Sequence, residues 1–123
     1  MNEQTTNSVQ SDKLTIGSIL EPSTAILQPD LTVAQAINKL RSDAQKSFFT
    51  YAYVVDDQRK LIGVIVMREL LFSTPETKIN DIMIRAPFFL TPEIEVLDCM
   101  KLVVAKHYPE YPVCDSQGVL LGS

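Results

Sequence analysis

Residues 51–66 read YAYVVDDQRKLIGVIV, two apolar runs on either side of a polar segment, and they decide the architecture of this chain. The runs 51–55 and 61–66 are rich in β-branched and aromatic residues, which are typical of strands. The segment between them, Asp56 to Lys60, supplies turn-forming residues. The stretch therefore predicts a β-hairpin, in which we expect four residues to be buried: Val54, Val55, Ile62 and Val64.

A second copy of this hairpin lies 59 residues further along, where residues 111–122 read YPVCDSQGVLLG. Here we expect Val113 and Leu120 to be buried. Upstream of the hairpins the copies match at a shift of 63, so that Ile16 falls on Ile79 and Pro29 on Pro92. Two collinear blocks of matches in one order indicate an internal repeat.

Each copy predicts the same elements in the order β-α-β-β-α. A helical turn (16–20, 79–83) and a short strand (25–27, 88–90) lead into an amphipathic helix. One apolar face of each helix is expected to pack on a sheet; the faces are Val33, Ala36, Ile37 and Leu40, and Val96, Cys99, Met100, Val103 and Val104. Thr32 and Gln35 have capping-box spacing, and 67–72 predicts a closing helix.

The predicted fold class is α/β (α+β), with two pseudo-symmetric repeats. We expect a disordered leader in 1–13, repeat 1 in 14–77 and repeat 2 in 78–123. Repeat 2 is expected to be truncated at its C-terminus, because the counterpart of the closing helix would follow Ser123. This exposes apolar surface, which favours association, and we expect a homodimer.

Composition excludes several classes of function. The net charge is −4 and the 11 Lys and Arg residues are scattered, which argues against a nucleic-acid partner. The two cysteines, Cys99 and Cys114, have apolar flanks and are interpreted as reduced core thiols of a cytoplasmic protein. We find no nucleophile–base or metal-ligand motif typical of an enzyme, so no catalytic residue is predicted.

The hairpin, with the stretches 53–56, 61–64 and 68–70, resembles the cystathionine-β-synthase (CBS) repeat. Within that family the chain is similar to the cytosolic part of MgtE-type magnesium transporters, through the stretches 68–71, 75–77 and 81–83. The resemblance implies a regulatory module, with a membrane transport domain following this fragment.

The resemblance also implies an adenine-nucleotide (AMP or ATP) site. The family motif falls on residues 63–69, where Val66 replaces a hydroxyl residue and Glu69 replaces an aspartate. Arg68 and Glu69 are candidates for contacts with phosphate and ribose, and Tyr108 for stacking on the base. The alternative is that Arg68 and Glu69 are solvated charges at a helix start, and that Tyr108 packs in the core.

Magnesium (Mg²⁺) is the other expected ligand, because the resemblance places an acidic ligand at Glu95. Asp98 lies nearby, and hard cations prefer oxygen ligands. Leu97 and His107 stand where further acidic residues are expected, which predicts weak binding. The alternative is that both acids favour the start of a helix.

Three functions remain open. The first is a non-catalytic module that regulates a magnesium or other divalent-cation transporter. The alternative is a stand-alone or enzyme-linked CBS module that senses adenine nucleotides. A purely structural dimerisation module is a third possibility.

Overall fold

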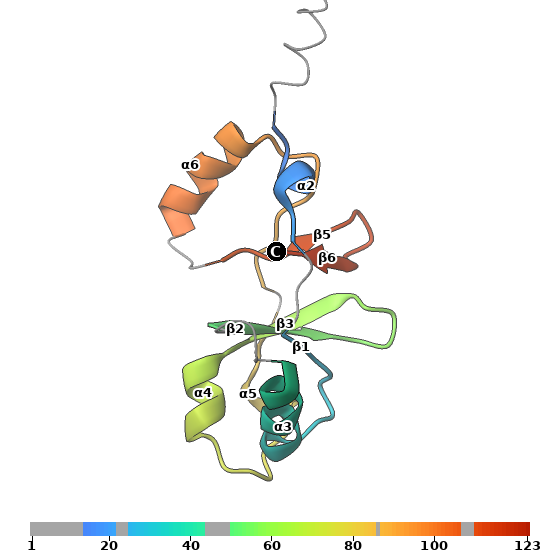
Figure 1. The fold of residues 1–123 in the computed structure, drawn as a ribbon, viewed down its shortest axis with the longest axis vertical. Helices are drawn as coiled ribbons and strands as arrows, with labels where there is room; N and C mark the ends of the chain where they lie inside the picture. The colour runs from blue at the N-terminus through green and yellow to red at the C-terminus, as the bar shows by residue number, and fades with distance from the viewer. Residues whose placement is uncertain (1–13, 22–24, 44–49, 86, 107–109) are drawn as a thin grey trace, which may run out of the picture.

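The computed structural model describes residues 14–21, 25–43, 50–85, 87–106 and 110–123, so the predicted leader lies outside the described residues. Along the chain the elements are α2 (Ile16–Ile19), β1 (Ile26–Leu27), α3 (Val33–Asp43), β2 (Tyr51–Val55), β3 (Leu61–Val66), α4 (Met67–Phe72), α5 (Ile79–Ile82), β4 (Ile84–Arg85), α6 (Val96–Lys106), β5 (Val113–Cys114) and β6 (Leu120–Gly122). They form two stacked halves (Figure 1). The first half contains β1 to β4 with α3, α4 and α5, and the second half contains α2, α6, β5 and β6. The predicted α/β (α+β) class is confirmed.

The first half is built on a four-stranded sheet in the order β1-β2-β3-β4. The predicted hairpin has the expected bounds, with Tyr53 of β2 opposite Val64 of β3 in an antiparallel pair. β1 joins β2 in parallel, and β4 pairs with β3. The sequence did not predict β4, because a two-residue strand is too short to show an alternating pattern.

The two short helices exchange places between the repeats. α5 places Ile79 and Met83 in the core of the first half, beside Leu70 of α4. α2, from the start of the chain, places Ile16 in the core of the second half, beside Leu90. The ranges 14–77 and 78–123 therefore describe copies in the sequence, whereas each packed half contains a helix from the other copy.

The exchanged helices are held by symmetric hydrogen bonds. The backbone N–H of Ile79 donates to the carbonyl of Leu31 at 2.8 Å. The N–H of Ile16, 63 residues earlier, donates to the carbonyl of Ile94 at the same 2.8 Å. The repeat in the sequence is thus a repeat in the backbone hydrogen bonding.

The two hairpins meet back to back across the pseudo-twofold axis. Leu61 N–H donates to the carbonyl of Gly118, and Leu120 N–H donates to the carbonyl of Arg59, both at 2.9 Å. Under the shift of 59, Leu61 and Arg59 correspond to Leu120 and Gly118, so the pseudo-symmetry converts each bond into the other. Between the hairpins lies an apolar cluster of five buried residues: Tyr53, Val55, Val64, Cys114 and Leu120.

The predicted capping box forms at the start of α3. Thr32 N–H donates to Oε1 of Gln35 at 2.9 Å, and Gln35 N–H donates to Oγ1 of Thr32 at 3.2 Å. These bonds satisfy donors that a helix start leaves without partners. Of the predicted face, Val33, Ala36 and Leu40 are buried, and Ile37 is half-buried against the same core.

The predicted face of α6 is only partly buried. Cys99 is buried, but Met100 is 55% exposed, so its predicted packing on a sheet is wrong. Leu97 is 74% exposed. Val103 and Val104 lie in the helix, and their side chains are outside the described part. In the first half α4 adds Leu70 to the core, and among the described residues the second half has no counterpart of α4.

Two further expectations are corrected. The predicted strand 88–90 is reduced to one parallel bridge between Leu90 and Val113, because the backbone pairing there extends over too few residues. Ile62 is half-buried rather than buried, lying at the edge of the first core. The other five predicted core residues are buried: Val54, Val55, Val64, Val113 and Leu120.

Candidate ligand cleft

A cleft of about 150 Å³ lies where the sheet of the first half faces the segments that lead into the second half. The alternation of side chains along a strand puts Tyr51 and Tyr53 on one face of the sheet. Eight residues line the cleft: Tyr51, Tyr53, Val64, Ile84, Pro87, Phe88, Glu110 and Pro112. Both sequence copies contribute to this lining, so the cleft exists only in the assembled pair.

A short hydrogen bond joins two residues that line the cleft. The hydroxyl of Tyr53 donates to Oε2 of Glu110 at 2.6 Å. Burial raises the pKa of Tyr53, and the bond to Glu110 raises it further. The phenol therefore stays protonated at physiological pH and remains the donor. The carboxylate keeps acceptor capacity for a second donor, since an ionised carboxylate has about four acceptor sites.

Aromatic rings form much of the remaining wall. Phe88 lies edge-on to Tyr111, with the ring centroids 6.0 Å apart and the planes at 81°. Tyr51 and Tyr53 add aromatic surface from β2. Flat apolar ligands pack well on such rings. Together with the Glu110 carboxylate, the walls suit an aromatic ligand that carries N–H donors.

Of the described residues predicted to bind a nucleotide, none is in the lining of this cleft. Val66 ends β3 opposite Tyr51 and is half-buried. Arg68 and Glu69 are exposed in the first turn of α4. Tyr108 lies outside the described residues.

The residues predicted to bind metal lie at the start of α6. Glu95 is half-buried and pairs with Thr15 in a backbone bridge, and Asp98 is exposed in the first helical turn. The repeat places Glu95 and Asp98 at the positions of Thr32 and Gln35, which cap α3. Across the described ranges, no group of three or more His, Cys, Asp or Glu residues could hold a metal ion.

Glu110 is the polar residue of the cleft that the sequence did not single out. Under the shift of 59 it corresponds to Tyr51, so the two copies differ strongly in character at this position. Such a mismatch between otherwise similar copies is the signal that marks it. Its contact with Tyr53 required the fold, since 57 residues separate the two.

Comparison with protein-family models matches the CBS domain to residues 16–75 and 79–123. Two magnesium transporters named MgtE are similar to the chain. The protein of Bacillus subtilis is 28% identical over 92 residues, covering 74% of this chain and 20% of the relative. That of Thermus thermophilus is 27% identical over 109 residues, covering 86% and 24%. The chain thus spans about a fifth to a quarter of these relatives.

Among solved structures, the chain is similar to the cytosolic domain of the Mg²⁺ channel MgtE in complex with ATP. The two share 25% sequence identity and superpose with a TM-score of 0.84, covering 89% of this chain and 45% of that one. In the described ranges, no helix has both the length and the apolar character needed to cross a membrane.

Proposed function

Because the chain belongs to the CBS domain family, whose members are regulatory and non-catalytic modules, we propose that it regulates a magnesium or other divalent-cation transporter. The support is its similarity to MgtE proteins over most of the chain. In this proposal the module is cytoplasmic, forms a homodimer, has no catalytic activity and acts on a membrane transport domain.

The cleft is the proposed ligand site, and an adenine nucleoside or nucleotide is the proposed ligand. The observation that carries this is the Tyr53–Glu110 pair between aromatic walls. Aromatic surface would pack against the base, and Glu110 would accept from its exocyclic amine. Arg68 and Glu69, on the adjoining helix, are proposed to contact the phosphate and ribose. Tyr108 is proposed to stack on the base.

Mg²⁺ is the second proposed ligand, held weakly by Glu95 and Asp98. Carboxylates that approach one another across a dimer interface repel, and a cation reduces that repulsion. Mg²⁺ also gives up its waters reluctantly, so a site with few carboxylates binds it weakly. An enzyme-linked or stand-alone nucleotide sensor is the competing function, which the cleft supports equally.

Separate titrations of Mg²⁺, ATP and adenosine test the assignment by thermal melting of wild type, Glu110→Gln and Glu95→Ala. We expect adenosine or ATP to raise the melting temperature of wild type and Glu95→Ala, and to raise that of Glu110→Gln less. We expect Mg²⁺ to stabilise wild type and Glu110→Gln but not Glu95→Ala. At about 100 times the Kd, a ligand adds about 2.7 kcal/mol of stability.

The outcomes separate the two functions. A nucleotide response without any Mg²⁺ response would favour the nucleotide sensor. If each ligand changed the melting temperature of all three proteins by the same amount, both proposed sites would be contradicted.

A further inference from the structure

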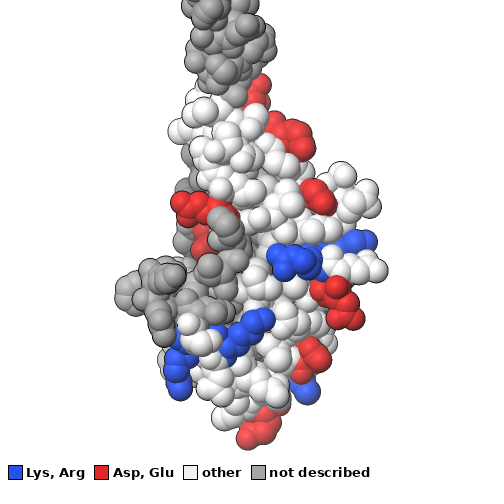
Figure 2. Space-filling view, turned by 45° about the vertical axis from the view of Figure 1, so that its right-hand side comes forward, with Lys and Arg blue, Asp and Glu red and all other residues white. Residues whose placement is uncertain are grey.

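The cleft differs from the outer surface in the charge that it offers a ligand. On the face shown in Figure 2, both acidic and basic side chains lie on the middle and lower parts. Among the described residues that line the cleft, by contrast, Glu110 alone carries a charge. The other polar side chains of that lining belong to Tyr51 and Tyr53. A polar group of a ligand in this cleft therefore lies near the Glu110 carboxylate, between walls that are mostly apolar.

The hydrogen bond from Tyr53 determines which ligand groups this carboxylate can bind. The Tyr53 hydroxyl donates to Oε2 of Glu110 at 2.6 Å, a length typical of a charge-assisted O–H···O⁻ bond. An ionised carboxylate only accepts hydrogen bonds, and a hydroxyl that has already donated its proton can also only accept. The pair thus offers acceptors to a ligand and no donor. Because the side chain of Tyr53 is buried, its hydroxyl also holds the carboxylate in one orientation.

Purines differ in the groups that they would present to such a pair. Adenine has an exocyclic amine, which donates hydrogen bonds, whereas guanine has a carbonyl oxygen at the same ring position, which accepts them. The amine would find an acceptor at Glu110. The carbonyl oxygen would lose water there without gaining a hydrogen bond, and the carboxylate would repel its partial negative charge. A site built around a polar contact strongly rejects ligands that cannot form that contact.

We propose that Glu110 determines the specificity of the cleft by accepting a hydrogen bond from the exocyclic amine of a 6-aminopurine, and that Tyr53 is its positioning residue. This role rests on the proposed nucleoside site and adds the choice of base to it. The cleft then selects adenosine over purine nucleosides that have hydrogen or a carbonyl oxygen in place of the amine.

The test is isothermal titration calorimetry of the full chain with three nucleosides. Adenosine has the amine, purine riboside has hydrogen in its place, and inosine has a carbonyl oxygen there. We expect the Kd for adenosine to be at least about tenfold lower than for the other two, because each of them loses one desolvated polar contact. Melting curves set the titration temperature below the transition of every variant.

The variant Glu110→Gln separates recognition of the amine from a merely structural role. If Tyr53 donates to the amide oxygen, the amide N–H groups face the ligand as donors. We therefore expect this variant to bind adenosine at least about tenfold more weakly, and inosine more tightly, than wild type does. A gain for inosine cannot come from loss of structure. Asp57→Asn, which removes the same charge from an exposed turn, should leave all three Kd values unchanged.

The double variant Tyr53→Phe/Glu110→Gln tests the positioning role of Tyr53. Without the hydroxyl the amide can turn either its oxygen or its N–H groups toward the ligand. We expect this protein to bind adenosine and inosine about equally, unlike Glu110→Gln alone. If the double variant kept the preference of Glu110→Gln, Tyr53 would have no positioning role.

The outcomes distinguish the role of Glu110 from the existence of the site. If wild type bound none of the three nucleosides, both the proposed nucleoside site and the role of Glu110 would be contradicted. If wild type bound all three equally, the site would stand and the role of Glu110 would be overturned. The role would also be overturned if Glu110→Gln kept the wild-type preference for adenosine over inosine.

Discussion

The hydrogen bond from Tyr53 to Glu110 connects the two copies through single side chains. Since Tyr53 is 1% exposed, its phenol has exchanged water for protein partners, among them the Glu110 carboxylate. We expect Tyr53→Phe to lower the free energy of unfolding by about 1.5–3 kcal/mol, the range for a bond to a charged group. Urea unfolding of wild type and Tyr53→Phe measures this difference.

The same tyrosine makes stability depend on alkaline pH. Burial raises the pKa of Tyr53, so the folded state keeps a proton that the unfolded state loses above its ordinary pKa of about 10. This stabilisation is complete below pH 10 and is lost progressively as pH rises above it. We therefore expect stability to fall less between about pH 9 and 11 in Tyr53→Phe than in wild type. Stability curves that fall in parallel for the two proteins would contradict this role of Tyr53. Burial also raises the pKa of Cys114, to about 11, but this thiol is present in both proteins and contributes equally to both.

The hairpin turns contain the same backbone conformation with different residues. Arg59 has φ 64° and Gly118 has φ 86°, and each N–H donates to the carbonyl of the aspartate three residues earlier. A side chain costs about 1–2 kcal/mol in this region, and glycine avoids that cost. We expect Arg59→Gly to raise the free energy of unfolding by about 0.5–1 kcal/mol, net of glycine's greater freedom when unfolded.

The reciprocal change controls for loss of the Arg59 side chain. A Cβ at Gly118 would meet nothing within 4 Å, so Gly118→Ala tests the backbone alone. It should destabilise the protein by a similar amount. Opposite signs for the two substitutions support the conformational cause, whereas equal signs would exclude it.

At the scale of elements, each exchanged helix ends against a glycine of a hairpin. Gly63 in β3 lies against Met83, and Gly122 in β6 lies against Leu20 and the backbone of Glu21. The two glycines are equivalent under the shift of 59. A Cβ added at Gly122 would first meet backbone, whereas one added at Gly63 would first meet a side chain. We expect Gly122→Ala to cost about 1–3 kcal/mol and Gly63→Ala to cost less, because the thioether of Met83 can move. Thermal melting of both variants orders them, and a larger loss for Gly63→Ala would contradict the packing.

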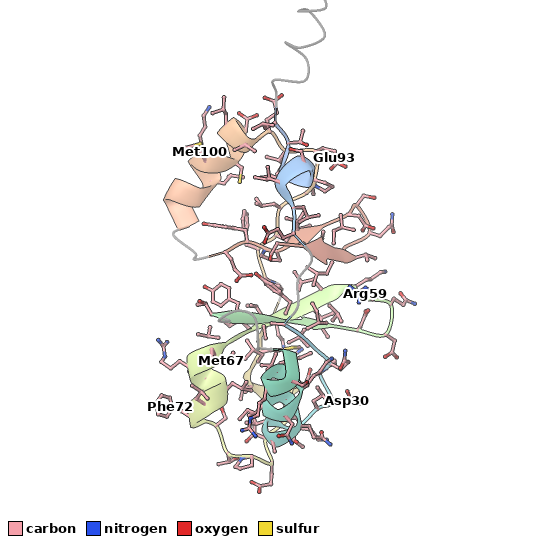
Figure 3. The ribbon with its side chains drawn as sticks, in the orientation of Figure 1. Asp30, Arg59, Met67, Phe72, Glu93 and Met100 are labelled. Atoms are coloured by element: carbon pink, nitrogen blue, oxygen red, sulfur yellow. The ribbon has the colours of Figure 1, made fainter. Side chains whose placement is uncertain are left out.

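At the scale of the whole molecule, exposed apolar residues of α4 and α6 lie on one side. Leu97 is 74% exposed and Phe72 is 85% exposed. Figure 3 labels Phe72 on α4 and Met100 on α6 on the same side of the molecule. A twofold pairing of this side would cover both helices. We expect light scattering to show a homodimer for wild type and a monomer for Leu97→Asp.

Gln58→Asp, which adds the same charge on an exposed turn, serves as the control and should remain a dimer. A monomeric wild type at high micromolar concentration would argue against this interface.

Local sequence determined the parts of this protein that depend on neighbours along the chain. The β-branched and aromatic runs 51–55 and 61–66 defined the hairpin, Asp56 its turn, and Thr32 with Gln35 the start of α3. Each of these depends on contacts within a few residues, so their patterns were sufficient. The internal repeat added the pairing of two such units, because equal sequences fold to equal units.

Tertiary structure alone decided which surfaces meet. The exchange of α2 and α5, the two-residue strand β4 and the contact of Tyr53 with Glu110 all join residues far apart in sequence, and no local periodicity encodes such distances. The exposure of Met100 has the same origin: its helical spacing matches Ile37, but burial depends on what packs opposite. The sequence thus determined the repeating units, and the fold determined their shared cleft, since the cleft arises only from the way the units are placed together.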